Sequence, residues 1–127
     1  MIETMTRHRI LLVDDDQRIL HFSRLKLMAL GYNVTTAMTG QGALTMIESE
    51  EPDIVVLDLR MPGMGGLEVL NILRSHSDLP VIVVSAATDL AEEALVAGAD
   101  DFIAKPFRAD ELVRRIEQIL EGKNRRK

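Results

Sequence analysis

The sequence predicts an α/β protein in which a parallel sheet of five strands carries helices on both faces. Two apolar runs support this class: residues 10–13 end at three consecutive aspartates, 14–16, and residues 54–57 end at Asp58. An apolar run of four residues bounded by charge is typical of a strand that is buried on both faces. Strand and helix patterns alternate along the chain with short connections, and right-handed crossovers then make the strands parallel.

The first four elements follow from apolar periodicity and a helix stop signal. A strand is expected at about 9–13 and a helix at about 17–30. Gly31 would end this helix, because glycine is the common residue just after the last helical turn. Residues 32–38 alternate in part and are rich in Val and Thr, which favours a second strand. A short helix is expected at about 40–49.

The middle of the chain combines a buried strand with a glycine-rich loop. The third strand, 54–57, begins after the turn at Pro52 and ends at Asp58. Residues 59–66 contain three glycines and a proline, which is typical of a loop. A helical stripe of leucines begins at Leu67.

The last third repeats the alternation twice. Residues 81–84 are a further apolar strand ending at Ser85, and a helix is expected at about 89–97. Residues 101–104 form a short last strand. In the segment 112–120, apolar residues recur at the spacing of one helix face, which predicts an amphipathic helix.

Length and composition indicate one globular domain. We assign residues 1–122 to it and read the basic segment 123–127 as a tail or the start of a linker. The chain lacks cysteine, so disulfides, thiolate metal sites and cysteine nucleophiles are excluded. No apolar stretch approaches a membrane span, and residues 1–9 lack the apolar centre of a signal peptide, so we expect a cytoplasmic protein without membrane contact. A net charge of −5 and 3% aromatic residues argue against direct nucleic-acid binding by this domain.

The candidate chemistry lies where the strands end. Asp14 and Asp15 follow the first strand, Asp58 the third, Ser85 the fourth and Lys105 the fifth. The carboxyl ends of parallel strands face the crevice where α/β sheets bind ligands. Clustered carboxylates are typical ligands of Mg²⁺, which leaves room for a phosphate. A carboxylate could then attack phosphorus and form an acyl phosphate.

The chain resembles the receiver domain of bacterial two-component response regulators over nearly its whole length. Four segments match this family in order and spacing: 12–15, 56–66, 84–86 and 98–107. The resemblance implies a flavodoxin-like or CheY-like fold with strand order 2-1-3-4-5. It also implies a signalling domain that catalyses only its own phosphorylation and dephosphorylation.

The resemblance also assigns roles to the strand-end residues. Asp58 matches the residue that accepts phosphate from the phosphohistidine of a sensor histidine kinase or a phosphotransfer protein. Asp14 and Asp15 match the acidic metal residues, with Asp15 a direct ligand, and the main-chain carbonyl of Arg60 matches a further ligand. The implied metal is Mg²⁺ or Mn²⁺.

The remaining implied roles concern the signal. Ser85 matches the hydroxyl that turns toward the phosphoryl group, Phe102 the aromatic switch residue, and Lys105 the lysine that pairs with phosphate. The bond from Lys105 to Pro106 matches the cis peptide of the family. Phosphorylation would change a surface made by the fourth helix, last strand and last helix, and so control a downstream output domain or protein, or a possible homodimer.

Simpler roles exist for several of these residues. Asp14 or Asp16 could cap the first helix, and we assign that role mainly to Asp16. Ser85 could be only a turn residue, Lys105 an exposed lysine and Phe102 a half-buried strand residue. Two other functions remain open: an Mg²⁺-dependent phosphohydrolase with an aspartyl phosphate, and an unphosphorylated scaffold of the same fold.

Three features depart from the family pattern. Gly65 stands where the family usually has Asp, which could loosen the loop that presents the Arg60 carbonyl. The segment 85–98 is about two residues short, so we expect a short or displaced fourth helix. Arg60 and Ala87 occupy positions that tune hydrolysis of the acyl phosphate, and they predict slow autodephosphorylation. Arg60 also replaces the general acid that a phosphohydrolase would need.

Overall fold

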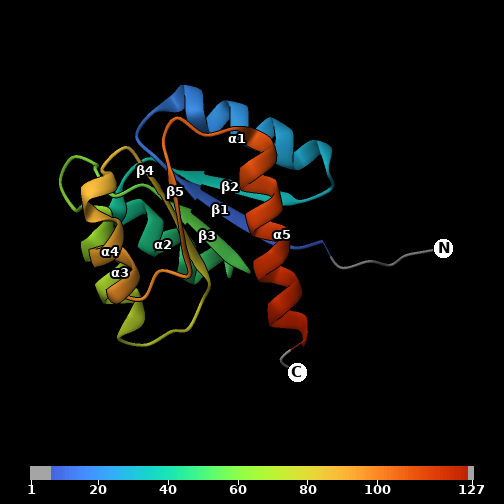
Figure 1. Cartoon of the computed structure of the whole chain (residues 1–127). Coiled ribbons are helices and arrows are strands. Elements are labelled where there is room, and N and C mark those ends of the chain that lie inside the picture. The colour runs from blue at the N-terminus through green and yellow to red at the C-terminus, as the bar shows by residue number, and fades with distance from the viewer. Residues whose placement is uncertain (1–6, 126–127) are drawn as a thin grey trace.

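The computed structural model describes residues 7–125 as a central sheet between two layers of helices (Figure 1). The strands are β1 (Arg9–Val13), β2 (Asn33–Ala37), β3 (Ile54–Leu57), β4 (Val81–Ser85) and β5 (Asp101–Ala104). The helices are α1 (Gln17–Ala29), α2 (Gly40–Glu50), α3 (Gly66–Arg74), α4 (Ala91–Val96) and α5 (Ala109–Arg125), with a 3₁₀ turn η1 (Thr88–Leu90) before α4.

All neighbouring strands are parallel and the sheet order is β2-β1-β3-β4-β5, which confirms the predicted class and order. The register aligns the strand ends. Val13 lies opposite both Ala37 and Leu57, and Ser85 lies opposite Ala104. The residues that follow β1, β3 and β5 therefore emerge at the same edge of the sheet.

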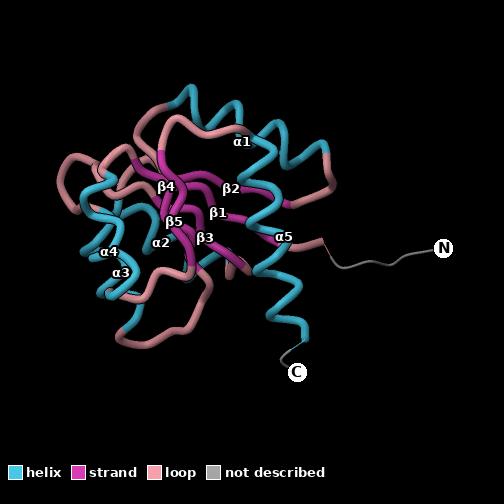
Figure 2. The backbone as a smooth tube through the Cα atoms, viewed as in Figure 1, coloured by secondary structure: helices cyan, strands magenta, loops and turns pink. Residues whose placement is uncertain are grey.

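Side-chain alternation along the buried strands divides the core in two. Leu11, Val13, Val55 and Leu57 face the layer of α2, α3 and α4. The alternate residues of the same strands pack with α1 and α5, whose buried positions are Leu20, Leu27, Leu112, Ile116 and Leu120. Figure 2 shows the strands as the middle layer of this arrangement. Both faces of β1 and β3 are covered, which explains their unbroken apolar runs.

The limits of α1 agree with its predicted start and stop signals. Asp16 is the N-cap, and its Oδ1 accepts a hydrogen bond from the Arg18 backbone N–H at 2.9 Å. Gly31 follows the helix with φ +96°, a left-handed conformation that favours glycine. Asp16 therefore acts as the helix cap that the sequence indicated.

The lengths of α4 and α5 can be compared with the helices that the sequence predicts. The helix α4 has only six residues, which confirms the short fourth helix. The helix α5 begins at Ala109, ahead of its apolar stripe, and continues to Arg125. Residues 123–125 of the predicted basic tail thus belong to its backbone, whereas 126–127 lie outside the described residues. Within residues 7–125, no helix combines the length and apolar character needed to cross a bilayer.

Candidate functional site

Two buried aspartates lie side by side at the edge of the sheet. Asp14 directly follows β1 and Asp58 directly follows β3, and each is only 5% exposed. Their backbones continue the sheet, because Asp58 N donates to Val13 O at 3.0 Å and Asp14 N donates to Ala37 O at 3.1 Å. The main chain therefore fixes where both carboxyl groups start.

Lys105 joins the two aspartates. Its Nζ lies 2.8 Å from Asp14 Oδ2 and 3.3 Å from Asp58 Oδ2. Its backbone N–H donates to Ser85 O at 3.0 Å, which positions it at the end of β5 beside β4. The following bond to Pro106 is cis, as the resemblance implies. Lys105 is therefore a half-buried partner of the acids rather than an exposed lysine.

The carboxyl groups fit a divalent metal ion. One carboxylate oxygen from each of Asp14, Asp15 and Asp58 lies within 4.8 Å of the other two. Asp15 is exposed, whereas its two companions are buried. Oxygen donors with this much negative charge suit a hard cation such as Mg²⁺. The contribution of the Arg60 carbonyl stays a prediction.

Burial and pairing shift two pKa values at this site. Burial raises the pKa of Asp14 above its usual range, although bonds from Lys105 Nζ and from the Asp16 N–H, 3.0 Å away, partly offset the rise. Burial alone would lower the pKa of Lys105. The hydrogen bond and charge of Asp14 oppose this effect, together with the charge of Asp58, and the pKa of Lys105 is raised as a result. The ammonium therefore stays charged.

Ser85 and Phe102 lie on neighbouring strands near this group. Ser85 is 1% exposed, and its Oγ accepts a hydrogen bond from the Ala87 backbone N–H at 3.0 Å. This bond is the turn role that the sequence left open for Ser85. Phe102 is half-buried and packs against the core beneath α2, α3 and α4. Its position agrees with a half-buried strand residue.

The loop after Asp58 contains a contact that the sequence did not single out. A Cβ placed on Gly66 would overlap the carbonyl oxygen of Asp58 and lie 2.7 Å from Leu59 Cα. Gly66 N also donates to Leu59 O at 2.8 Å. Gly66 thus lets α3 begin directly behind Asp58. Gly65 is the N-cap of α3 and offers no side-chain cap.

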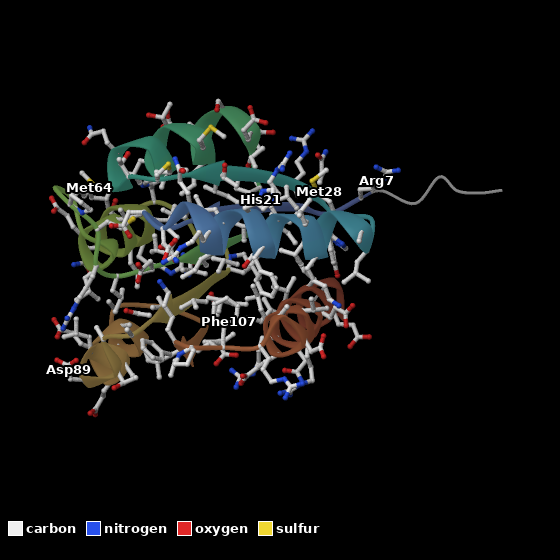
Figure 3. The ribbon with its side chains drawn as sticks, turned by 90° about the horizontal axis from the view of Figure 1, so that it is seen from above. Arg7, His21, Met28, Met64, Asp89 and Phe107 are labelled. Carbon is white, nitrogen blue, oxygen red and sulfur yellow. The ribbon has the colours of Figure 1, made fainter. Side chains whose placement is uncertain are left out.

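The Arg60 side chain reaches η1 in this structure. Its guanidinium lies 3.8 Å from Asp89 Oδ1 of η1, and both side chains are mostly exposed. Asp89 lies at the outer side of the α4 region (Figure 3). An exposed ion pair of this length contributes about 0–1 kcal/mol, so Arg60 can leave it readily.

Comparison with known proteins gives consistent matches. A family model described as the response regulator receiver domain matches residues 10–117. The transcriptional regulatory protein KdpE of Mycobacterium tuberculosis is 47% identical over 113 residues, which cover 87% of this chain and 50% of KdpE. The DNA-binding response regulator MtrA of Mycolicibacterium smegmatis is 39% identical over 121 residues, covering 94% and 53%. The chain thus spans about half the length of these relatives.

Solved structures agree in fold. A CheY-like response regulator receiver domain protein from Methanospirillum hungatei superposes with a TM-score of 0.90 at 31% identity, covering 96% of this chain and 100% of the other. The response regulator TrrA from Thermotoga maritima, solved in complex with Mg²⁺ and BeF, gives a TM-score of 0.80 at 34% identity, covering 87% and 97%.

Proposed function

Because this chain belongs to the response regulator receiver domain family, we propose that it is a phospho-acceptor switch of a two-component system whose acceptor is Asp58. One observation carries the proposal. The buried carboxyl group of Asp58 lies with two further carboxyl groups and within 3.3 Å of an ammonium group. Carboxylate and ammonium groups at a strand edge suit the transfer of a phosphoryl group, in which catalysis consists mainly of positioning and charge stabilisation.

The proposed step is a displacement at phosphorus. An oxygen of Asp58 attacks the phosphorus of a phosphohistidine, the P–N bond breaks, and the imidazole leaves with its electron pair. Lys105 pairs with the phosphoryl oxygens, and the Ser85 hydroxyl donates to one of them. Mg²⁺ or Mn²⁺, held by Asp14, Asp15, Asp58 and the Arg60 carbonyl, would neutralise charge on the incoming phosphoryl group.

The output follows from a change of partners. Lys105 gives up its bonds to the free carboxylates, and Ser85 exchanges its bond with Ala87 for one with the phosphoryl group. Phe102 lies on β5 and packs against the core cluster that includes Ala94 of α4, so it can relay the shift to the surface of α4, β5 and α5. A state change has an output only if a partner or a second copy binds one state better. KdpE is a transcriptional regulatory protein and MtrA is a DNA-binding response regulator, which supports transcription as the process controlled.

The surface beside the site supports a protein as phosphate donor. Phe22 of α1 is 54% exposed, a high value for a large apolar side chain. With Ile19 it lines a mostly apolar groove that continues over Lys105, Pro106 and Phe107. An apolar groove next to the lysine of the acceptor site suits docking of a sensor histidine kinase or phosphotransfer protein.

Phosphorylation in the absence of any partner tests the proposal. We expect incubation with acetyl phosphate and Mg²⁺ to add one phosphoryl group, measured as an intact-mass gain. Asp58→Ala should abolish the gain, whereas the matched variant Asp78→Ala, at an exposed loop aspartate, should keep it. No gain on the wild type would instead favour the unphosphorylated scaffold, and turnover of a phosphomonoester would favour the phosphohydrolase.

A further inference from the structure

One buried hydroxyl group has no part in the proposed phosphoryl chemistry. Ser23 of α1 is only 4% exposed and lies on the same helix face as the buried Leu20 and Leu27. Within residues 7–125 its side chain makes no hydrogen bond. Buried hydroxyl groups in folded proteins almost always have a partner, which is often an ordered water. Ser23 is therefore a buried hydroxyl group to which an ordered water could bond.

The space for such a partner adjoins Ser23. A cavity of about 20 Å³ lies between α1, the sheet and the start of α5. Its polar lining residues are Ser23 and Asp14, and its other lining residues are apolar, with Phe107 on the side of α5. Figure 3 labels Phe107 between α1 and α5. One water molecule needs roughly 10–15 Å³ of such space, so the cavity fits a single water.

We propose that this cavity is a binding site for one water molecule, which accepts a hydrogen bond from the Ser23 hydroxyl and donates one to Asp14. Asp14 has capacity for the bond. Its Oδ1 already accepts from the Asp16 N–H at 3.0 Å and its Oδ2 from Lys105 Nζ at 2.8 Å, but each carboxylate oxygen can accept two hydrogen bonds.

The water makes Ser23 a positioning residue for Asp14. Asp14 is then held from three sides: by the start of α1 through Asp16, by β5 through Lys105, and by the middle of α1 through Ser23 and the water. Partners that orient a metal-ligating carboxylate strengthen metal binding. This consequence rests on the proposed function, whereas the water site itself does not.

A crystal structure of the wild type at a resolution that defines ordered waters tests the site. We expect one water within hydrogen-bond distance of both Ser23 Oγ and an Asp14 oxygen. Ser23→Val, which carries no hydroxyl and projects methyl groups into the cavity, should lose this water. Either of two results in the wild type would overturn the site: a cavity without water density, or a Ser23 hydroxyl bonded to a carbonyl of α1.

Mg²⁺ titration by calorimetry tests the positioning role separately. Ser23→Ala should weaken Mg²⁺ binding by up to about tenfold, and Ser23→Thr, which keeps the hydroxyl, should restore most of it. The control Ser49→Ala, at an exposed serine of α2, should match the wild type. Equal affinity of Ser23→Ala and the wild type would refute the positioning role. A dry cavity in a protein that takes phosphate on Asp58 defeats this inference alone, whereas a hydrated cavity in a protein that takes none defeats the proposed function alone.

Discussion

Asp58 is positioned by a residue that has no side chain. Gly66 lies directly behind its carbonyl group, and a Cβ there would meet backbone atoms of Asp58 and Leu59. Backbone atoms cannot turn aside as the end of a long side chain can. Any larger residue at this position must therefore move the start of α3, the backbone of Asp58, or both.

Substituting Gly66 should destabilise the fold strongly, although alanine adds only one methyl group. We expect Gly66→Ala to lower the free energy of unfolding by about 1–3 kcal/mol, because overpacking forces the backbone to shift. Gly122→Ala is the matched control in α5, where no described atom lies within 4 Å of the added Cβ. This control should raise stability by up to about 1 kcal/mol, since alanine favours helix. Urea denaturation measures both, and an unchanged Gly66→Ala would contradict the close contact.

Arg60 should influence the lifetime of the acyl phosphate on Asp58. It leaves a weak exposed contact with Asp89 at little cost, so it can pair with phosphate on the neighbouring acceptor. We expect the acyl phosphate to last far longer than seconds, and Arg60→Ala to shorten it about two- to fivefold. Loss of phosphate after removal of the donor measures this. Arg114→Ala, at an exposed arginine of α5, should have no effect, and a lifetime of seconds in the wild type would reject slow hydrolysis.

The sequence predicts charged site residues better than the small residues around them. Asp14, Asp58 and Lys105 each come where a strand ends, so their meeting point follows from the sheet. Gly66 is one of three glycines in a loop, and only packing decides which of them lies against the backbone. Ser23 looks like any polar residue of an amphipathic helix, and its burial depends on how α1 lies on the sheet.

At the scale of elements, the sequence predicted the ends of helices that carry a cap. It did not predict the ends of strands and helices that lack such a local signal. Asp16 and Gly31 mark the limits of α1 through local chemistry that a sequence carries. The strand β2 is shorter than expected by one residue at each end, because its alternation does not say where pairing with β1 stops. The start of α5 was missed because its first turn is polar, although acidic residues there suit a helix N-terminus.

The helix α4 is the element that should open most easily. It has six residues, no side-chain cap and one buried side chain, Ala94. Isolated helices shorter than roughly 12–15 residues are marginal in water, so α4 depends on few contacts. We expect its amides to exchange with solvent at least about tenfold faster than those in the middle of α5, measured by native-state hydrogen exchange. Equal protection of the two helices would contradict this ranking.

At the scale of the whole molecule, the sheet order followed from alternation, handedness and the family resemblance. What the sequence left open is how completely the acids would be buried. That burial leaves the native protein with closely placed carboxylates, and among residues 7–125 Lys105 is the cation that pairs with Asp14 and Asp58. A bound cation should therefore stabilise the entire fold.

The stabilisation by a bound cation should grow with pH, although the contribution of Asp14 without a cation falls. Burial raises the native pKa of Asp14 above its unfolded value of 3.8, so the native state binds this proton more tightly than the unfolded chain. The contribution of Asp14 to stability therefore falls as pH rises from 3.8 through the native pKa. Mg²⁺ binds the charged carboxylate, so it should raise Tm more at neutral pH than near about pH 4.

Thermal unfolding with and without Mg²⁺ measures the effect. At a Mg²⁺ concentration ten times Kd, the expected gain is about 1.4 kcal/mol. Asp15→Asn removes an exposed ligand with little effect on packing and should abolish most of the gain. A Mg²⁺ effect that is equal at the two pH values, or that survives in Asp15→Asn, would contradict binding at these aspartates.

The bond from Lys105 to Asp14 spans 91 residues of sequence, and the bond to Asp58 spans 47. A nascent chain whose last strand is still inside the ribosome therefore holds two acids without their counter-charge. Truncated or half-translated copies cannot assemble the centre, however well their first strands pair. Under the proposed function, the chain can therefore take phosphate on Asp58 only after the strand that leads into Lys105 has been synthesised and has joined the sheet.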